Sequence, residues 1–269
     1  MNQTEIPFYW IDAFTSEPFG GGPTVVCIVD KEVSDDVLSN VAKETGVLET
    51  AFVEKIGESE YNLRWFYSDG SEAPFAGYAT LAAAHMLIEE YMVKCPITFH
   101  TLTGIWIADV NDGKVTVFIP FLLDVKKIDD KRILEAFDMT DYVEIYYNDD
   151  QATFMILLEN HEQVETIIPD QCRIQKVLEK LGARRVLVTA RGQEPIDFVY
   201  RMFLLSREDY ACGSAQTGLS PYWKKVLGKD KLRSMQPHSR VSELIAEPLE
   251  NGVKITSKAR ILVKGKLYV

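Results

Sequence analysis

The chain has 269 residues, 46% of them hydrophobic and 26% charged, so it can bury a sizeable core in one large domain or two of moderate size. Its formal net charge of -11 at pH 7 argues against nucleic acid and against an anionic membrane surface as partners. No run of about 18 apolar residues occurs, which excludes a membrane-spanning helix.

The N-terminal stretch MNQTEIPFYW lacks the basic and apolar regions of a secretory leader. The four cysteines are widely spaced and form no Cys-x-x-Cys pair; they are Cys27, Cys95, Cys172 and Cys212. This spacing indicates neither a zinc site nor a disulfide framework. We therefore expect a reducing, cytoplasmic location.

The first half of the chain predicts short strands with a helix among them. Apolar and alternating stretches predict strands at 8–14, 23–29, 49–55, 61–67, 104–110 and 114–120. Ser34 is placed to cap a helix that Gly46 ends. Asp112 and Gly113 suit the tight primed turn of a hairpin.

The second half adds amphipathic helices and further strands. We expect the helices at 131–137 and 172–182, and strands at 184–190, 197–205, 240–249, 252–259 and 260–269. Strands followed by single helices, without strict βαβ alternation, predict a mixed α+β fold.

Two segments of the chain resemble each other. The segments 62–87 and 197–223 each run from an aromatic-rich strand through an acidic loop and a glycine into an apolar helix. This similarity favours two related domains that face each other. We place the first at 1–119, completed by the C-terminal strand near 259–269, and the second at 120–258. Chance similarity of two strand–loop–helix units is the alternative.

The two loop–helix junctions could bind an anion. The stretches 81–88 and 218–227 hold few charges before their ends, which predicts buried helices. A helix N-terminus carries a partial positive charge and free N–H groups, so two that face one cleft would hold a carboxylate or a developing enolate. The alternative is a pair of ordinary core helices that use glycine for packing.

Two acidic residues lie beside these junctions. Glu49 lies between apolar residues, and Asp209 comes just before the second helix. A carboxylate partly buried among apolar residues has a raised pKa, which suits a general acid or base. A solvated surface role is the alternative for each.

Five motifs are spaced along almost the whole chain. In chain order they are DAFT with PFGGGP (12–23), LETAFV (48–53), FYS with EAPFAGYATL (66–81), FHTLTG (99–104) and DFVYRMF with EDYACGSAQ (197–216). Together they resemble the motifs of the PhzF family, the phenazine-biosynthesis-like isomerases. The resemblance implies a diaminopimelate-epimerase-like fold, in which each of two similar domains wraps a sheet around a central helix and the active site lies between them.

The resemblance also implies an isomerase that moves a proton on a small carboxylate substrate without a metal or organic cofactor, and a homodimer. Carried over by motif, Glu49 would be the general base and acid, and Asp209 the second catalytic carboxylate. The backbone N–H groups of three residues would bind the substrate's anionic end: Gly77, Gly213 and Ser214.

Tyr78 stands where the family has a histidine. A phenol can orient or polarise a carbonyl, but it is a poor proton shuttle near neutral pH. Other departures are Gly22, Leu48, Tyr210 and Gln216. They leave open a catalytically weakened member that binds a metabolite or a protein. A two-thiol racemase is disfavoured, because Cys212 has no cysteine counterpart at 74–77.

Overall fold

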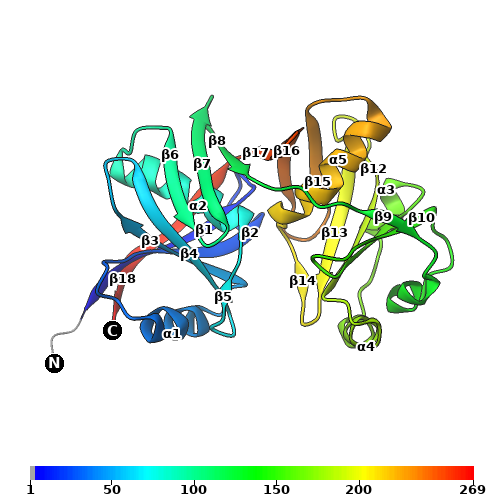
Figure 1. Ribbon diagram of the computed structural model, residues 1–269, viewed down its shortest axis with the longest axis horizontal. Coiled ribbons are helices and arrows are strands. Elements are labelled where there is room, and N and C mark those ends of the chain that lie inside the picture. The colour runs from blue at the N-terminus through cyan, green and yellow to red at the C-terminus, as the bar shows by residue number, and fades with distance from the viewer. Residues whose placement is uncertain (1–3) are drawn as a thin grey trace.

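The structure is a computed structural model that describes residues 4–269. Residues 1–3 lie outside the described residues. They are the start of the stretch MNQTEIPFYW and of the first predicted domain. Two halves lie side by side, and each surrounds one helix with strands (Figure 1). None of the described helices is long and apolar enough to cross a membrane.

The first half confirms the strands predicted there and contains two helices. Its strands are β1 (Glu5–Ala13), β2 (Gly22–Ile28), β3 (Glu49–Lys55), β4 (Glu60–Tyr67), β5 (Glu72–Ala73), β6 (Ile97–Thr101), β7 (Gly104–Asn111) and β8 (Lys114–Ile119), and its helices are α1 (Asp35–Thr45) and α2 (Gly77–Tyr91). Gly46 ends α1 in the left-handed region, whereas the Ser34 side chain makes no capping bond. Asp112 and Gly113 have positive φ values of 49° and 68°, as the hairpin turn between β7 and β8 requires.

The second half begins at a crossing loop after β8. Its first elements are β9 (Lys126–Ile128), the 3-10 helix η1 (Lys131–Phe137), β10 (Glu144–Asn148), β11 (Thr153–Leu157), α3 (His161–Glu165), α4 (Gln171–Leu181), β12 (Arg185–Arg191) and β13 (Phe198–Leu204). The expected α-helix at 131–137 is therefore wrong in type. Asp130 caps η1 and Asp138 ends it in the left-handed region, and 3-10 helices are common as connectors of this kind between strands.

The remaining elements surround the second central helix and return to the first half. They are β14 (Glu208–Asp209), the 3-10 turn η2 (Gly213–Ala215), α5 (Gln216–Leu227), β15 (Leu232–Gln236), β16 (Ser242–Leu249), β17 (Gly252–Ser257) and β18 (Ala259–Tyr268). The strand β17 pairs with β8, and β18 pairs antiparallel with β1. Leu244 and Val253 also pack into the core of the first half. The division into domains at 120 and 259 stays a prediction.

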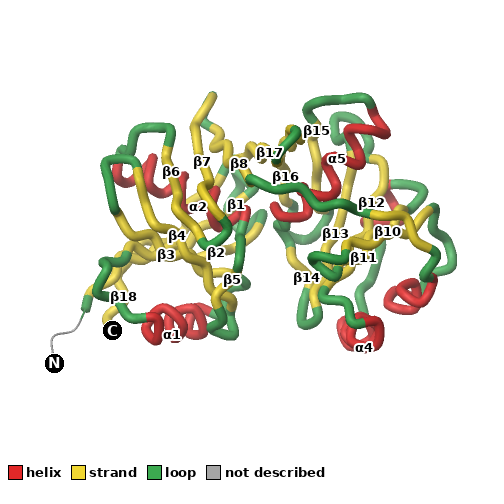
Figure 2. Tube along the Cα trace, viewed as in Figure 1, coloured by secondary structure: helices red, strands yellow, loops and turns green. Residues whose placement is uncertain are grey.

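Each central helix lies among strands, whereas α1 and α4 lie outside them (Figure 2). The alanines 82–84 of α2 are fully buried, and their small side chains let the sheet approach closely. Leu219 and Trp223 of α5 belong to a separate apolar cluster. The buried character predicted for the two helices is confirmed for 81–88 of α2, where no residue is exposed, whereas Lys225 and Val226 in the last turn of α5 are exposed.

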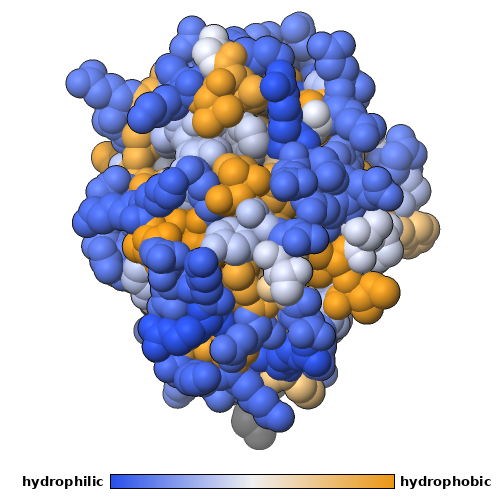
Figure 3. Space-filling model, turned by 90° about the vertical axis from the view of Figure 1, so that its right-hand side faces the viewer, coloured by the Kyte–Doolittle hydropathy of each residue, from blue (hydrophilic) through white to orange (hydrophobic). Residues whose placement is uncertain are grey.

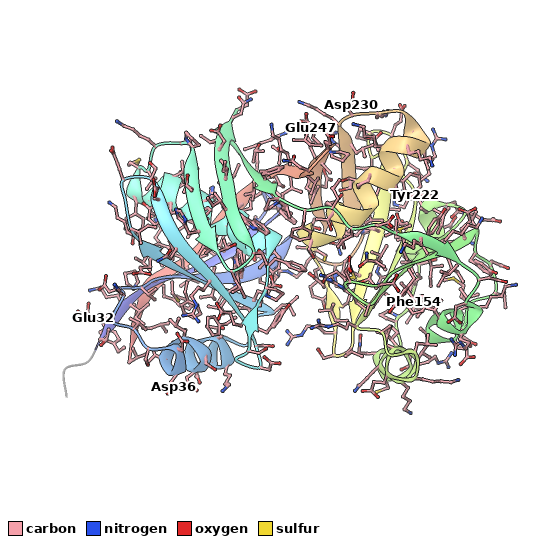
Figure 4. All side chains as sticks on the ribbon, viewed as in Figure 1. Glu32, Asp36, Phe154, Tyr222, Asp230 and Glu247 are labelled. Atoms are coloured by element: carbon pink, nitrogen blue, oxygen red, sulfur yellow. The ribbon has the colours of Figure 1, made fainter. Side chains whose placement is uncertain are left out.

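Charged side chains are exposed on both halves of the molecule. Asp36 on α1 and Asp230 beyond α5 are exposed and lie at opposite margins of the molecule, away from the junction between the halves (Figure 4). On the outer face of the second half, apolar side chains form separate patches among hydrophilic ones (Figure 3). All four cysteines are free.

The repeat proposed from the sequence is also a repeat of contacts. In the first half Arg64 donates two hydrogen bonds to Glu72, and its guanidinium lies 5.1 Å from the ring centroid of Phe66. In the second half the same contacts, with a ring distance of 5.2 Å, are made by Arg201, Glu208 and Phe203. The two halves are therefore related in structure as well as in sequence.

Candidate active site

The N-terminal ends of the two central helices meet between the halves. A Cβ built on Gly77 would lie 3.3 Å from the backbone carbonyl carbon and Cα of Gly213. A Cβ on Gly213 would lie 3.0 Å from Cζ of Phe14. Such close approach leaves little room for a side chain, which explains glycine at both positions.

These two N-termini differ from those at the surface. No side chain caps α2 after Ala76 or α5 after Ala215, and neither helix has an acidic residue in its first turn. Of the outer helices, η1, α3 and α4 are each capped by a side chain, from Asp130, Asn160 and Asp170 respectively. The outer helix α1 has no side-chain cap, but it carries Asp35 and Asp36 in its first turn. The N-termini of these two helices therefore have neither a side-chain cap nor an acidic residue of their own first turn to offset their positive dipole ends.

The second junction differs in detail from the first. Gly213 begins a 3-10 turn, and the α-helix itself starts at Gln216. Gly77 is therefore the first residue of its α-helix, whereas Gly213 precedes its α-helix by one 3-10 turn. The backbone N–H of Gln216 donates to the carbonyls of Gly213 and Ser214, which tightens the chain before the helix.

Glu49 is the first residue of β3, and its carboxyl is buried. The hydroxyl of Thr24 donates to its backbone carbonyl at 2.8 Å, which fixes the start of the strand. The side chain is only 8% exposed, and its Oε2 has no hydrogen-bond partner among the described residues. Burial and then the charge of Asp209 raise the pKa of Glu49 well above its usual value, against smaller opposing effects of Arg185 and Tyr78.

Asp209 comes from the other half, at the end of β14. Burial raises the pKa of its carboxyl, opposed chiefly by a hydrogen bond from the N–H of Ala211, which Oδ1 accepts at 3.1 Å. The loop that follows is held by Gln236 of β15. This side chain accepts from the N–H of Cys212 at 2.6 Å and donates to the carbonyl of Asp209 at 2.7 Å.

Tyr78 is the second residue of α2 and is 3% exposed. Burial, followed by the charge of Glu49, raises the pKa of its phenol well above the usual value, so the hydroxyl stays protonated and can donate. Together with Arg207 and Asp209, the tyrosine lines a pocket of about 220 Å³ between the halves. Tyr78 therefore both lines this pocket and acts on Glu49.

Gly22 provides the room for that tyrosine. A Cβ at position 22 would lie 2.4 Å from Cβ of Ala211 and 3.3 Å from Cδ2 of Tyr78. The phenol ring therefore occupies space beside position 22 that a larger residue there would need. The sequence departures at 22 and 78 are thus neighbours in space.

Of the other residues singled out near Gly213, Cys212 and Gln216 are buried and Ser214 is partly buried. Cys212 is 3% exposed, and burial raises the pKa of its thiol, so the group stays neutral as a small buried residue does. Its sulfur lies 3.3 Å from the hydroxyl of Ser214. The Gln216 amide lies 3.3 Å from the hydroxyl of Ser234, which accepts from it. Within residues 4–269, no group of three His, Cys, Asp or Glu side chains is placed to hold a metal ion.

The profile of the phenazine biosynthesis-like protein family, PhzC-PhzF, matches residues 11–266 of the chain. The chain belongs to the PhzF family. It is 32% identical to a protein named an isomerase in Pseudomonas aeruginosa, over 98% of this chain and 100% of the relative. The crystal structure of a PhzF-family protein from Enterococcus faecalis is 33% identical, covers 99% of this chain and 100% of its own, and superposes with a TM-score of 0.89.

The PhzF fold extends to more distant proteins. A hydroxyproline epimerase from Agrobacterium vitis superposes with a TM-score of 0.63 at 13% identity, over 98% of this chain and 93% of that one, a likeness of fold alone. This PhzF-family protein therefore has an α+β, epimerase-like fold, as the sequence motifs predicted. The named relatives also support an isomerase type of enzyme.

Sequence reasoning missed two arginines at the site of this PhzF-family protein. Arg207, between β13 and β14, donates to the hydroxyl of Ser68 at 2.9 Å and so links the two halves. Arg185 begins β12. The repeat held a signal for it, because Arg185 precedes Gly213 by the same number of residues as Glu49 precedes Gly77.

Proposed function

We propose that this PhzF-family protein is a cofactor-independent isomerase that moves a proton between carbons of a small carboxylated metabolite, with Glu49 as the acid and base. The observation that carries the proposal is the buried Glu49 carboxyl, which has an unpartnered oxygen and lies in the field of Asp209 from the other half. A raised pKa lets such a group both accept and return a proton near neutral pH.

The proposed step uses one proton and no external reagent. Ionised Glu49 removes a proton from a carbon conjugated with the substrate carboxylate, and the C–H electron pair moves into the substrate as an enolate. The protonated Glu49 then returns the proton to another carbon of the same conjugated system. The sum is an isomerisation, with no change in the oxidation state of the molecule.

The surroundings of Glu49 suit the charge that develops in this step. The backbone N–H groups of Gly77, Gly213 and Ser214 would bind the anionic end, and two uncapped helix N-termini would stabilise the enolate. Asp209, as the second carboxylate, helps to hold the Glu49 pKa high. The Tyr78 hydroxyl would orient or polarise the substrate carbonyl, because its own proton is held too firmly to shuttle.

The proposal extends to the setting of the enzyme. We propose that it works as a cytoplasmic homodimer, as the family resemblance suggests. Analytical ultracentrifugation of the purified chain tests the dimer, which sediments at twice the mass of one chain if the proposal holds. A monomer at micromolar concentration would contradict this part alone.

The test of the reaction is deuterium wash-in from D₂O. A panel of small unsaturated carboxylic acids is incubated with the protein and followed by proton NMR for loss of carbon-bound signals. We expect at least one acid to exchange with the wild type and none of that exchange to survive in Glu49→Gln. Exchange that persists in Glu49→Gln would contradict the role of Glu49, whereas acids that bind without exchange would favour a metabolite-binding protein.

A further inference from the structure

Arg185 occupies the position in the second half that Glu49 occupies in the first. Glu49 begins β3 and pairs with Tyr67, the last residue of β4. Arg185 begins β12 and pairs with Leu204, the last residue of β13. The two related halves therefore present a carboxyl at one of these positions and a guanidinium at the other.

The guanidinium of Arg185 has neutral hydrogen-bond partners. Its Nε donates to the hydroxyl of Thr153 at 2.9 Å, and its Nη2 donates to the side-chain oxygen of Gln151 at 2.6 Å. Among the residues that the structure describes, no carboxylate lies within ion-pair distance of it. These two bonds fix the side chain and leave its positive charge without a protein counter-ion.

The same guanidinium lies at the junction between the halves. It is 5.9 Å from the ring centroid of Phe75, which precedes Gly77 in the first half. It also lines a small cavity together with Ser214. Its charge lowers the pKa of both Glu49 and Asp209, so it acts on both carboxyls of the site.

Other buried or half-buried arginines near the junction are already paired. Arg201 is buried against Glu208, and Arg240 pairs with Asp12 at 2.6 Å. Arg207 is the competing candidate, because it lines the pocket beside Tyr78 and pairs with no carboxylate among the described residues. It differs from Arg185 in its partner, because Arg207 donates to Ser68 of the opposite half, whereas both partners of Arg185 belong to its own half.

We propose that Arg185 binds the anionic group of the substrate, facing Glu49 across the junction, and thereby selects carboxylates over neutral analogues. This inference rests on the proposed function, which supplies the reacting site, and it names the group that orients the substrate there. An arginine is suited to this task because its fork of donors matches the two oxygens of a carboxylate.

The test compares the binding of benzoate with that of the neutral benzamide, by isothermal titration calorimetry at pH 7.5. We expect the wild type to prefer benzoate. Arg185→Gln should weaken benzoate binding by roughly 10- to 100-fold, the range expected for a lost charge-assisted hydrogen bond, and leave benzamide binding unchanged. Arg185→Lys should keep part of the preference, because it keeps the charge without the fork.

Two further arginine variants, Arg191→Gln and Arg207→Gln, serve as controls. Arg191→Gln removes the same charge from the exposed end of β12 and should behave as the wild type. A wild type that binds benzoate no better than benzamide, an unchanged preference in Arg185→Gln, or a preference lost in Arg207→Gln instead, would overturn the proposal. Melting temperatures of all variants show whether any loss reflects unfolding.

The binding test is separable from the test of the reaction. Glu49→Gln should abolish deuterium wash-in and still prefer benzoate, because Arg185 remains. If no acid exchanges deuterium but Arg185→Gln still loses the benzoate preference, the proposed isomerisation fails and the role of Arg185 stands. If Glu49-dependent exchange occurs with Arg185→Gln at unchanged KM, the role of Arg185 fails and the isomerisation stands.

Discussion

Glu49 places an ionisable group in the buried part of its strand. The residues that follow it, Ala51 and Val53 among them, are fully buried. A buried carboxyl with an unsatisfied oxygen destabilises a fold. Its presence at the meeting point of two helix N-termini is therefore better explained by chemistry than by packing.

That destabilisation should depend on pH. The folded-state pKa of Glu49 is raised above its usual value of 4.5. The protein therefore has its full stability below pH 4.5, where Glu49 is protonated in both the folded and the unfolded chain, and loses part of its free energy of unfolding as pH rises through the folded-state pKa. Glu49→Gln removes this loss. We therefore expect the variant to match the wild type near pH 4.5 and to exceed its free energy of unfolding by about 1 kcal/mol or more at pH 8.

Urea denaturation at the two pH values measures this difference. The exposed Glu58→Gln, which removes the same charge from the turn between β3 and β4, should show no such pH-dependent gain. A Glu49→Gln variant that is less stable than the wild type at pH 8 would contradict the account.

We expect Tyr78 to affect the pKa of the same Glu49 carboxyl. Its hydroxyl favours the ionised form of Glu49 and so lowers the pKa of that group. Tyr78→Phe should therefore raise the Glu49 pKa further and move the acid limb of the exchange-rate profile to higher pH. The profile is measured by deuterium wash-in between pH 5 and 9, with Tyr61→Phe on β4 as the control. An acid limb that stays in place would show that the hydroxyl does not act on Glu49.

At the scale of elements, the repeated Arg–Glu pair offers a matched comparison. The Arg201 and Glu208 side chains are 5% and 6% exposed, whereas the Arg64 and Glu72 side chains are 35% and 31% exposed. Breaking a buried ion pair leaves an uncompensated charge, which costs about 3–5 kcal/mol. An exposed pair contributes about 1 kcal/mol or less.

We therefore expect Arg201→Gln to destabilise the protein several times more than Arg64→Gln. Thermal or urea denaturation of both variants under one condition provides the measurement. Equal losses would mean that the two halves do not differ in the burial that the structure assigns to their pairs.

We expect the stability of the protein to depend on the close packing between Gly22 of β2 and Ala211 in the turn before α5. Gly22→Ala brings its new Cβ against Ala211, and we expect a loss of about 1–3 kcal/mol from overpacking. The double variant with Ala211→Gly should recover most of it, because it removes the atom that clashes. A single variant as stable as the wild type, by the same denaturation assay, would contradict the packing at this position.

Much of the arrangement of elements follows from local patterns. Apolar and alternating stretches predicted β3 and β4, and Gly46 predicted the end of α1, because these signals lie within a few residues of the structures they determine. The type of η1 was wrong, since periodicity does not separate a short 3-10 helix from an α-helix. The pairing of β17 with β8 depends on contacts between distant segments and could not be predicted from either strand alone.

Some of the candidate site could also be predicted from the sequence. The motifs and the repeat predicted that Glu49, Asp209 and the two glycines belong together, and the structure places them at one junction. The role of Gln236 was not predicted, because its two hydrogen bonds to the 209–212 turn arise from the position of β15 and not from a local signal. Whether these residues are catalytic stays a prediction.

At the scale of the whole molecule, the two halves supply different groups. The first half brings Glu49 and Tyr78, and the second brings Asp209 and Arg185. The hydrogen bond from Arg207 to Ser68 and the contact of Arg185 with Phe75 hold these groups at one junction. The unusual pKa of Glu49 is thus a property of the assembled molecule, because part of its cause lies across the junction.

A direct test of this central claim is a carbon-13 NMR titration of the Glu49 side-chain carboxyl, which needs no knowledge of the substrate. The signal is assigned by its absence in Glu49→Gln. We predict a midpoint well above 4.5 in the wild type, and a lower midpoint in Asp209→Asn, because that variant lacks the negative charge that raises the pKa of Glu49. A wild-type midpoint at or below 4.5, or one that Asp209→Asn leaves unchanged, would contradict the account.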